Sequence, residues 1–122
     1  MIAFAINGVI FSFFTKKLKP YNEEVDPYYN IAKVGDTFDE QAQMAYFNLV
    51  KELEAAGASV NDVVKLNTYV VGLDRDKSKS NRKAKDQYFV AVNQPASTMV
   101  GVAALVMKAL LIEVEATAVM SE

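Results

Sequence analysis

Residues 110–119 read LLIEVEATAV, and this stretch decides how the C-terminal part of the chain folds. Its alternating pattern predicts a β-strand, in which residues i and i+2 point to the same face of the sheet. Glu113 and Glu115 therefore share one face, and Ile112 and Val114 share the other. A carboxylate amid apolar residues needs water, a partner or a chemical role, so the search for a functional site starts at this strand.

The segments on the N-terminal side predict two helices and four further strands. Asn7-Gly8 separates two apolar runs, which is a strong signal for a hairpin. A capping box, Thr37-x-x-Glu40, opens a helix whose apolar residues recur every three or four positions up to residue 56. The expected strands are 1–6, 9–14, 62–73, 98–105 and 110–119, and the expected second helix spans about 80–92 after a charged turn over 74–80.

Two helices that alternate with strands predict one mixed sheet with both helices packed on one face, which is an α+β fold. We expect a single domain over residues 1–122. The other face of the sheet would carry three polar and two apolar residues from the last strand, namely Glu113, Glu115, Thr117, Leu111 and Val119. Such a mixed surface favours a subunit interface with polar inclusions, and the alternative is a face open to water.

The composition restricts the chemistry that this protein can perform. The 122 residues are 52% hydrophobic and include neither cysteine nor histidine. This excludes a disulfide framework, a thiol nucleophile and an imidazole base, and it leaves carboxylates, hydroxyls, lysine, arginine and backbone amides for any catalysis. The sequence has no phosphate-binding glycine loop and no cluster of metal ligands, so we expect neither a cofactor nor a metal.

Charge and hydropathy bear on where the protein acts. The formal net charge of -2 gives no general attraction to nucleic acid or to anionic lipid. The apolar residues 1–14 are similar to a signal anchor, but no basic segment precedes them and Asn7-Gly8 interrupts them. We therefore expect a soluble, cytoplasmic protein without a membrane partner.

Four segments, taken together and in order, resemble one protein family. They are residues 52–59 (ELEAAGAS), 62–65 (DVVK) with Tyr69-Val70, 95–98 (PAST) with Val100 and Val102, and 112–116 (IEVEA). This set resembles the YjgF-like reactive intermediate/imine deaminase (Rid) family. The resemblance implies a chorismate-mutase-like α+β fold and a homotrimer, in which the helices lie outside and the sheets line a central barrel. It also implies three clefts between subunits, each holding a small-molecule ligand.

The resemblance further implies a set of site residues. In the typical deaminase branch, an Arg after Pro-Ala binds the substrate carboxylate, and a Glu in the last strand positions the attacking water. The Glu position corresponds to Glu113 and the Arg position to Ser97. The family's cleft Gly corresponds to Phe14, and its Tyr position falls before Met1. Because serine offers one hydroxyl and no charge, a substrate carboxylate would enter this cleft without its usual partner.

Glu113 is therefore the candidate catalytic residue, either as a water-activating base or as the partner of an ammonium-like group. The alternative is an interface acid paired with a cation or a hydroxyl. The candidate substrate-binding residues are Ser97, Thr98, Met99 and Phe14. Ser97 would donate a hydrogen bond, because no histidine is present to make it a nucleophile. For Glu115 we expect a structural, hydrogen-bonded role.

Residues 75–85 hold six of the 13 basic residues of the chain. The functional interpretation of this run is a patch for RNA or another anion. Aspartates intersperse the run, however, and no aromatic residues accompany it. The alternative is a solvated helix start, and we do not expect nucleic acid as a partner.

Three functions fit these observations. The first is a hydrolase or deaminase that acts on a small imine, enamine or related electrophile lacking the usual carboxylate. The second is a non-catalytic trimer that binds a small ligand or a protein partner. The third is an RNA-acting, endoribonuclease-like protein. A ligand beside Glu113 would favour the first two functions, and salt-dependent RNA binding by residues 75–85 would favour the third.

Overall fold

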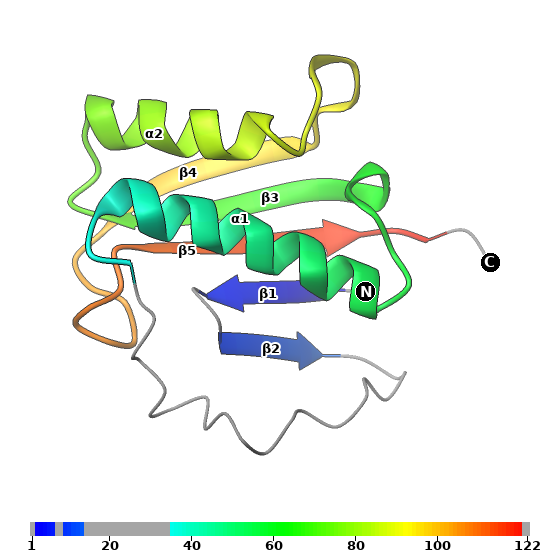
Figure 1. Cartoon of the computed structure of the whole chain (residues 1–122), viewed down its shortest axis with the longest axis horizontal. Helices are drawn as coiled ribbons and strands as arrows, with labels where there is room; N and C mark the ends of the chain where they lie inside the picture. Colours follow the sequence, from blue (N-terminus) through cyan, green and yellow to red (C-terminus); the bar gives the residue numbers. More distant parts are fainter. Residues whose placement is uncertain (1, 7–8, 14–34, 121–122) are drawn as a thin grey trace.

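The computed structural model of the protein describes residues 2–6, 9–13 and 35–120 (Figure 1). The strands are β1 (Ile2–Ile6), β2 (Val9–Phe13), β3 (Val63–Val71), β4 (Ala96–Val102) and β5 (Ile112–Ala118). The helices are α1 (Phe38–Ala55) and α2 (Arg75–Asp86), with short 3-10 helices over Val60–Asp62 and Ala91–Asn93. The sequence of element types is the one that the hydrophobic pattern predicts.

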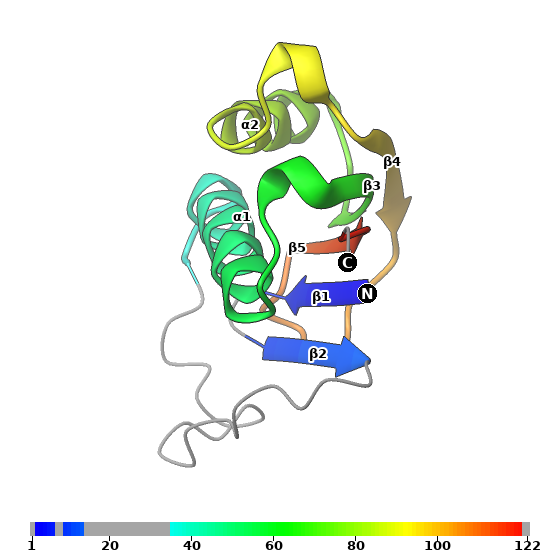
Figure 2. The same cartoon turned by 90° about the vertical axis from the view of Figure 1, so that its right-hand side faces the viewer.

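The strands form one five-stranded sheet in the order β2-β1-β5-β3-β4. β3 and β4 are parallel and are joined through α2, whereas the neighbouring strands elsewhere in the sheet are antiparallel. Figure 2 shows both helices on the same side of this sheet. This arrangement confirms the predicted α+β fold, a mixed sheet with two helices on one face.

The core lies between the helices and the sheet. Every second residue of β5 faces it: Ile112, Val114, Ala116 and Ala118 are at most 1% exposed. The residues of α1 that pack there are Ala42, Ala45, Tyr46, Leu49 and Leu53. The alternation in β5 is therefore a consequence of one covered face and one uncovered face, as the sequence pattern predicts.

The N-terminal hairpin and both ends of α1 also follow the sequence signals. β1 and β2 pair antiparallel with Ile6 opposite Val9, which is the register of a two-residue hairpin loop. The capping box is present at the start of α1. At its end, Gly57 has a φ of 81°, and the Ala58 N–H bonds to the Leu53 carbonyl at 2.8 Å. This is a Schellman motif, which requires the left-handed conformation that glycine adopts without strain.

The predicted position of the second helix is wrong. α2 spans Arg75–Asp86 rather than about 80–92, because Asp74 caps it: its carboxylate accepts a hydrogen bond from the Lys77 N–H at 2.8 Å. The helix ends before Phe89, whose ring is 2% exposed in the core. Val92, which the predicted helix would include, is 95% exposed.

Among the residues that the structure describes, no helix has the length and apolar character needed to cross a bilayer.

Candidate functional site

The strand registers define the residues of the uncovered sheet face. Tyr69 of β3 lies opposite Glu113 of β5, and Asn67 lies opposite Glu115. On its other side, β3 pairs with β4 so that Tyr69 lies beside Val100 and Asn67 beside Thr98. Paired residues project to the same face of a sheet. The uncovered face therefore carries two rows, one through Glu113, Tyr69 and Val100, the other through Glu115, Asn67 and Thr98.

Glu115 is held by hydrogen bonds within this face. Its Oε2 accepts one from the Tyr69 hydroxyl at 3.1 Å and one from Asn67 Nδ2 at 3.3 Å. Burial raises the pKa of Tyr69 above its ordinary value, and the hydrogen bond to Glu115 raises it further. The phenol thus stays a donor. These contacts support the structural role that the sequence analysis assigns to Glu115.

Glu113 has different surroundings, although it is only two residues away. It is half-buried, and none of the residues 35–120 gives its carboxylate a hydrogen bond or an ion pair. Burial raises the pKa of Glu113, and the nearby charge of Glu115 raises it further. A carboxylate in this state is a stronger base than an ordinary glutamate, and its oxygens are open to a water or a ligand.

The candidate substrate-binding residues do not all lie on the face of Glu113. Ser97 and Met99 pair with Leu66 and Thr68, two buried residues of β3, and so lie on the helix-covered side of the sheet. Met99 packs against the core there, whereas Ser97 is exposed on the edge strand. Thr98, by contrast, lies on the uncovered face. Phe14 lies outside the described residues.

Sequence reasoning missed Asn67 and Tyr69 as members of this site. Because the two residues are separated by one position in a strand, the sequence predicts that they lie on the same face of the sheet. The bonds to Glu115, however, span 48 and 46 residues of chain and depend on the register between β3 and β5. Among the described residues, no three potential metal ligands lie together.

The chain is similar to proteins of known family. The profile of the endoribonuclease L-PSP family matches residues 18–120. Among solved structures, YyfB of the conserved Rid protein family from Yersinia pestis is 36% identical, with a TM-score of 0.64, covering 70% of this chain and 65% of that one. Rv2704 from Mycobacterium tuberculosis, of the YjgF/YER057c/UK114 family, is 32% identical, with a TM-score of 0.63 and 70% of each chain covered.

A third solved structure holds a ligand. TdcF from E. coli with bound serine is 26% identical, with a TM-score of 0.64, covering 75% of this chain and 72% of that one. No curated protein matches the chain significantly.

The sheet, its two covering helices and these similarities define a chorismate-mutase-like fold. Because the family profile covers most of the sequence, the protein belongs to the endoribonuclease L-PSP family, which is the YjgF-like Rid family.

Proposed function

We propose that this protein hydrolyses a small imine, enamine or related electrophile in a cleft between the subunits of a homotrimer. The observation that carries the proposal is Glu113. It is a half-buried carboxylate with a raised pKa, without a partner among the described residues, on a sheet face that no described element covers. A chain without histidine or cysteine has few other groups that can activate water.

In the proposed reaction, the Glu113 carboxylate takes a proton from a bound water while the water oxygen attacks the carbon of the C=N bond. A C–O bond forms, the C=N π bond breaks, and its electron pair goes to nitrogen. Glu113 returns the proton to that nitrogen, which gives a carbinolamine. Glu113 then takes the proton of the carbinolamine hydroxyl and passes it to the amino nitrogen, the C–N bond breaks with its electron pair going to nitrogen, ammonia leaves and the carbonyl forms. Water and imine are thereby converted into carbonyl compound and ammonia without an external acid or base.

The position of Ser97 supports a site between two copies of the chain. Within one chain, Ser97 and Glu113 project to opposite faces of the sheet, and β3 separates their strands. β4 is an edge strand, so its exposed Ser97 can reach the uncovered face of a neighbouring subunit. In this proposal, one copy supplies the hydroxyl of Ser97 and the other supplies the base.

The same position points to substrates without a carboxylate. TdcF binds serine, which carries a carboxylate. Where the typical deaminase branch has an arginine to hold such a group, this chain has Ser97. An uncompensated carboxylate in the cleft would also be repelled by Glu113 and Glu115. We therefore propose that 2-imino acids are poor substrates and that neutral or cationic imines are better ones.

The test of this function is turnover by the Glu113→Gln variant. We expect imine hydrolysis to fall by about 100-fold or more, because glutamine keeps the size but cannot accept the proton. The matched control is Glu54→Gln, which changes an exposed carboxylate on α1 and should leave the rate unchanged. Unchanged turnover in a folded, trimeric Glu113→Gln protein would contradict the catalytic role.

The substrate arm of the test compares 2-iminopropionate with an imine that lacks the carboxylate. We expect little acceleration of 2-iminopropionate decay, and Ser97→Arg should increase it if the remainder of the cleft accepts the acid. Acceleration by the natural chain that equals that of an arginine-bearing relative would contradict the proposed substrate class.

The presence of Ser97 in place of the arginine also favours a second candidate function, a non-catalytic trimer that binds a small ligand in the same cleft. Ligand binding that depends on Glu113 without any turnover would identify this function.

A further inference from the structure

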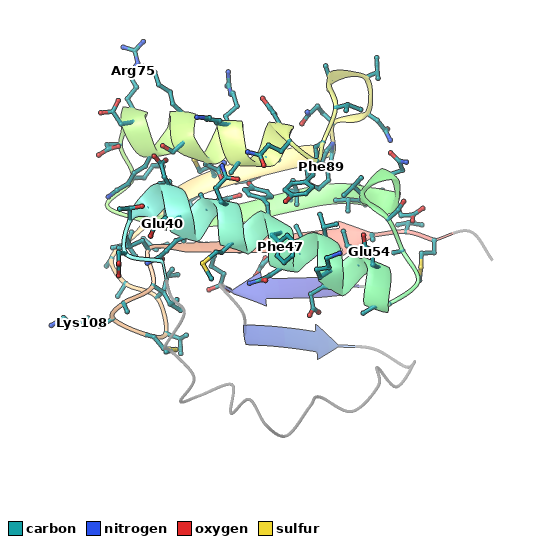
Figure 3. The ribbon with its side chains drawn as sticks, viewed as in Figure 1. Glu40, Phe47, Glu54, Arg75, Phe89 and Lys108 are labelled. Carbon is teal, nitrogen blue, oxygen red and sulfur yellow. The ribbon has the colours of Figure 1, made fainter. Side chains whose placement is uncertain are left out.

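The outer surface of α2 contains a feature that the proposed imine hydrolysis does not use. An open hollow of about 370 Å³ lies on this helix, lined by Arg75, Ser78, Lys79, Arg82, Lys83 and Asp86. Four of these six side chains are cations. Figure 3 shows Arg75 projecting outward from the start of the helix, away from the sheet. Since Glu113 lies on the opposite face of the sheet, the hollow is separate from the candidate catalytic site.

The orientation of α2 fixes this cationic side toward solvent. Its inner side is anchored by Ala84, which is fully buried, and by Asn81, which is 3% exposed. Asn81 Oδ1 accepts a hydrogen bond from the Tyr46 hydroxyl of α1 at 2.8 Å. Arg75, Lys79 and Arg82 therefore stand one above another on the outer side, at spacings i, i+4 and i+7.

The cations of the hollow are not used to hold the fold together. The sole ion pair among the described residues joins Lys51 and Glu54 on α1. Lys77, by contrast, has a structural role, because its Nζ donates to the carbonyls of Val71 at 3.0 Å and Gly72 at 2.9 Å. The charge is also local, since the whole chain has a net charge of -2 and a pI of about 5.2. Four unpaired cations on one side of a helix repel one another, and an anion would relieve this repulsion.

We propose that this hollow binds a linear polyphosphate chain, either inorganic or the tail of a nucleotide. Guanidinium groups hold phosphate oxygens in bidentate pairs, as Arg75 and Arg82 could, and Lys79 and Lys83 add point charges. The hydroxyl of Ser78 can donate to a further oxygen. The lining contains no aromatic side chain on which a base could stack, so the phosphate chain alone is bound. The carboxylate of Asp86, the last residue of α2, would repel the anion toward the Arg75 end of the hollow.

The experiment titrates the full-length protein with inorganic tripolyphosphate at low ionic strength and follows backbone amide shifts by NMR. We expect shifts confined to residues 75–86, similar affinities for tripolyphosphate and ATP, and weaker binding of orthophosphate. The double variant Lys79→Gln with Arg82→Gln should bind about tenfold more weakly, since each exposed charge pair contributes modestly. The matched control, Lys51→Gln with Lys108→Gln, removes two cations elsewhere and should bind as the natural chain does.

Four results would overturn the proposal. They are equal binding by the double variant, shifts centred outside α2, ATP binding without tripolyphosphate binding, and tighter binding of poly-glutamate or an RNA oligonucleotide than of tripolyphosphate. Because the readout is binding at α2, it is independent of whether the protein hydrolyses imines.

Discussion

At the scale of single residues, two glutamates of one strand face differ through their neighbours. Glu115 accepts hydrogen bonds from Asn67 and Tyr69, whereas no described residue bonds to Glu113. The sequence predicts that both carboxylates share a face, because that follows from the period of a strand. It does not predict which one is held by donors, because the donors come from β3 and depend on its register against β5.

Glu52 of α1 provides a residue-scale prediction about pH. It is 8% exposed, no described residue pairs with its carboxylate, and burial raises its pKa from 4.5 to about 7. Between these two values the folded state holds a proton that the unfolded state has released. Stability therefore falls as the pH rises from 4.5 to about 7, and the loss is complete above that window.

Glu52→Gln should remove this loss. We expect the variant to be more stable than the natural chain at pH 8, by about 2 kcal/mol, and nearly equal at pH 4. Urea unfolding at both pH values measures this difference. Glu54→Gln is the control, because that carboxylate is exposed and its ion pair with Lys51 contributes little. An identical pH slope in Glu52→Gln and the natural chain would show that the burial of Glu52 carries no penalty.

At the scale of elements, the two helices differ in how well the local sequence predicts where they begin and end. The start of α1 is encoded by the capping box and its end by Gly57, and both act within a few residues. For α2, the apolar residues after residue 87 predict that the helix continues. In the structure, Phe89 lies after the end of the helix, in an irregular segment, and packs in the core. The local sequence pattern does not predict this end of α2, because packing against the sheet decides whether the segment after residue 87 is helical or irregular.

Gln41 gives a prediction at this scale, because it joins α1 to the segment before β5. Its Nε2 donates to the carbonyls of Gly35 and Ala109, each at 2.9 Å, and its Oε1 accepts from the Leu111 N–H at 2.8 Å. Gln41 is 2% exposed, so water does not replace these bonds easily. The side chain thereby fixes the backbone two residues before Glu113.

We expect Gln41→Met to lower the free energy of unfolding by about 2–4 kcal/mol, because buried backbone groups lose their partners. Hydrogen exchange at the Leu111 amide should accelerate in the same variant. Gln43→Met, on a partly exposed position of the same helix, should change stability by less than about 0.5 kcal/mol. Equal stability of the two variants would mean that the hydrogen bonds of the Gln41 side chain do not stabilise the segment before β5.

At the scale of the whole molecule, the sequence pattern and the family resemblance together predict the mixed sheet and its one covered face. The arrangement of the candidate site is different, because it depends on which strands are neighbours. Ser97 and Glu113 belong to consecutive strands of the sequence, yet β3 lies between β4 and β5 and the two side chains face opposite ways. The strand order shows that one copy of the sheet does not present both side chains on the same face.

The last prediction concerns assembly. The uncovered face holds Val100, which is 40% exposed, in one row with Tyr69 and the half-buried Glu113. We expect sedimentation equilibrium to give three times the chain mass of 13.5 kDa, with this face inside the trimer. Val100→Glu should then dissociate the trimer, because it buries an unpaired charge at the interface. Val92→Glu introduces the same charge at a position that is 95% exposed and outside the sheet, and it should remain trimeric. If the natural chain is monomeric at micromolar concentration, there is no subunit contact. If the Val100→Glu variant stays trimeric, the contact lies elsewhere. Either result would contradict the proposed site that Ser97 and Glu113 share between two copies.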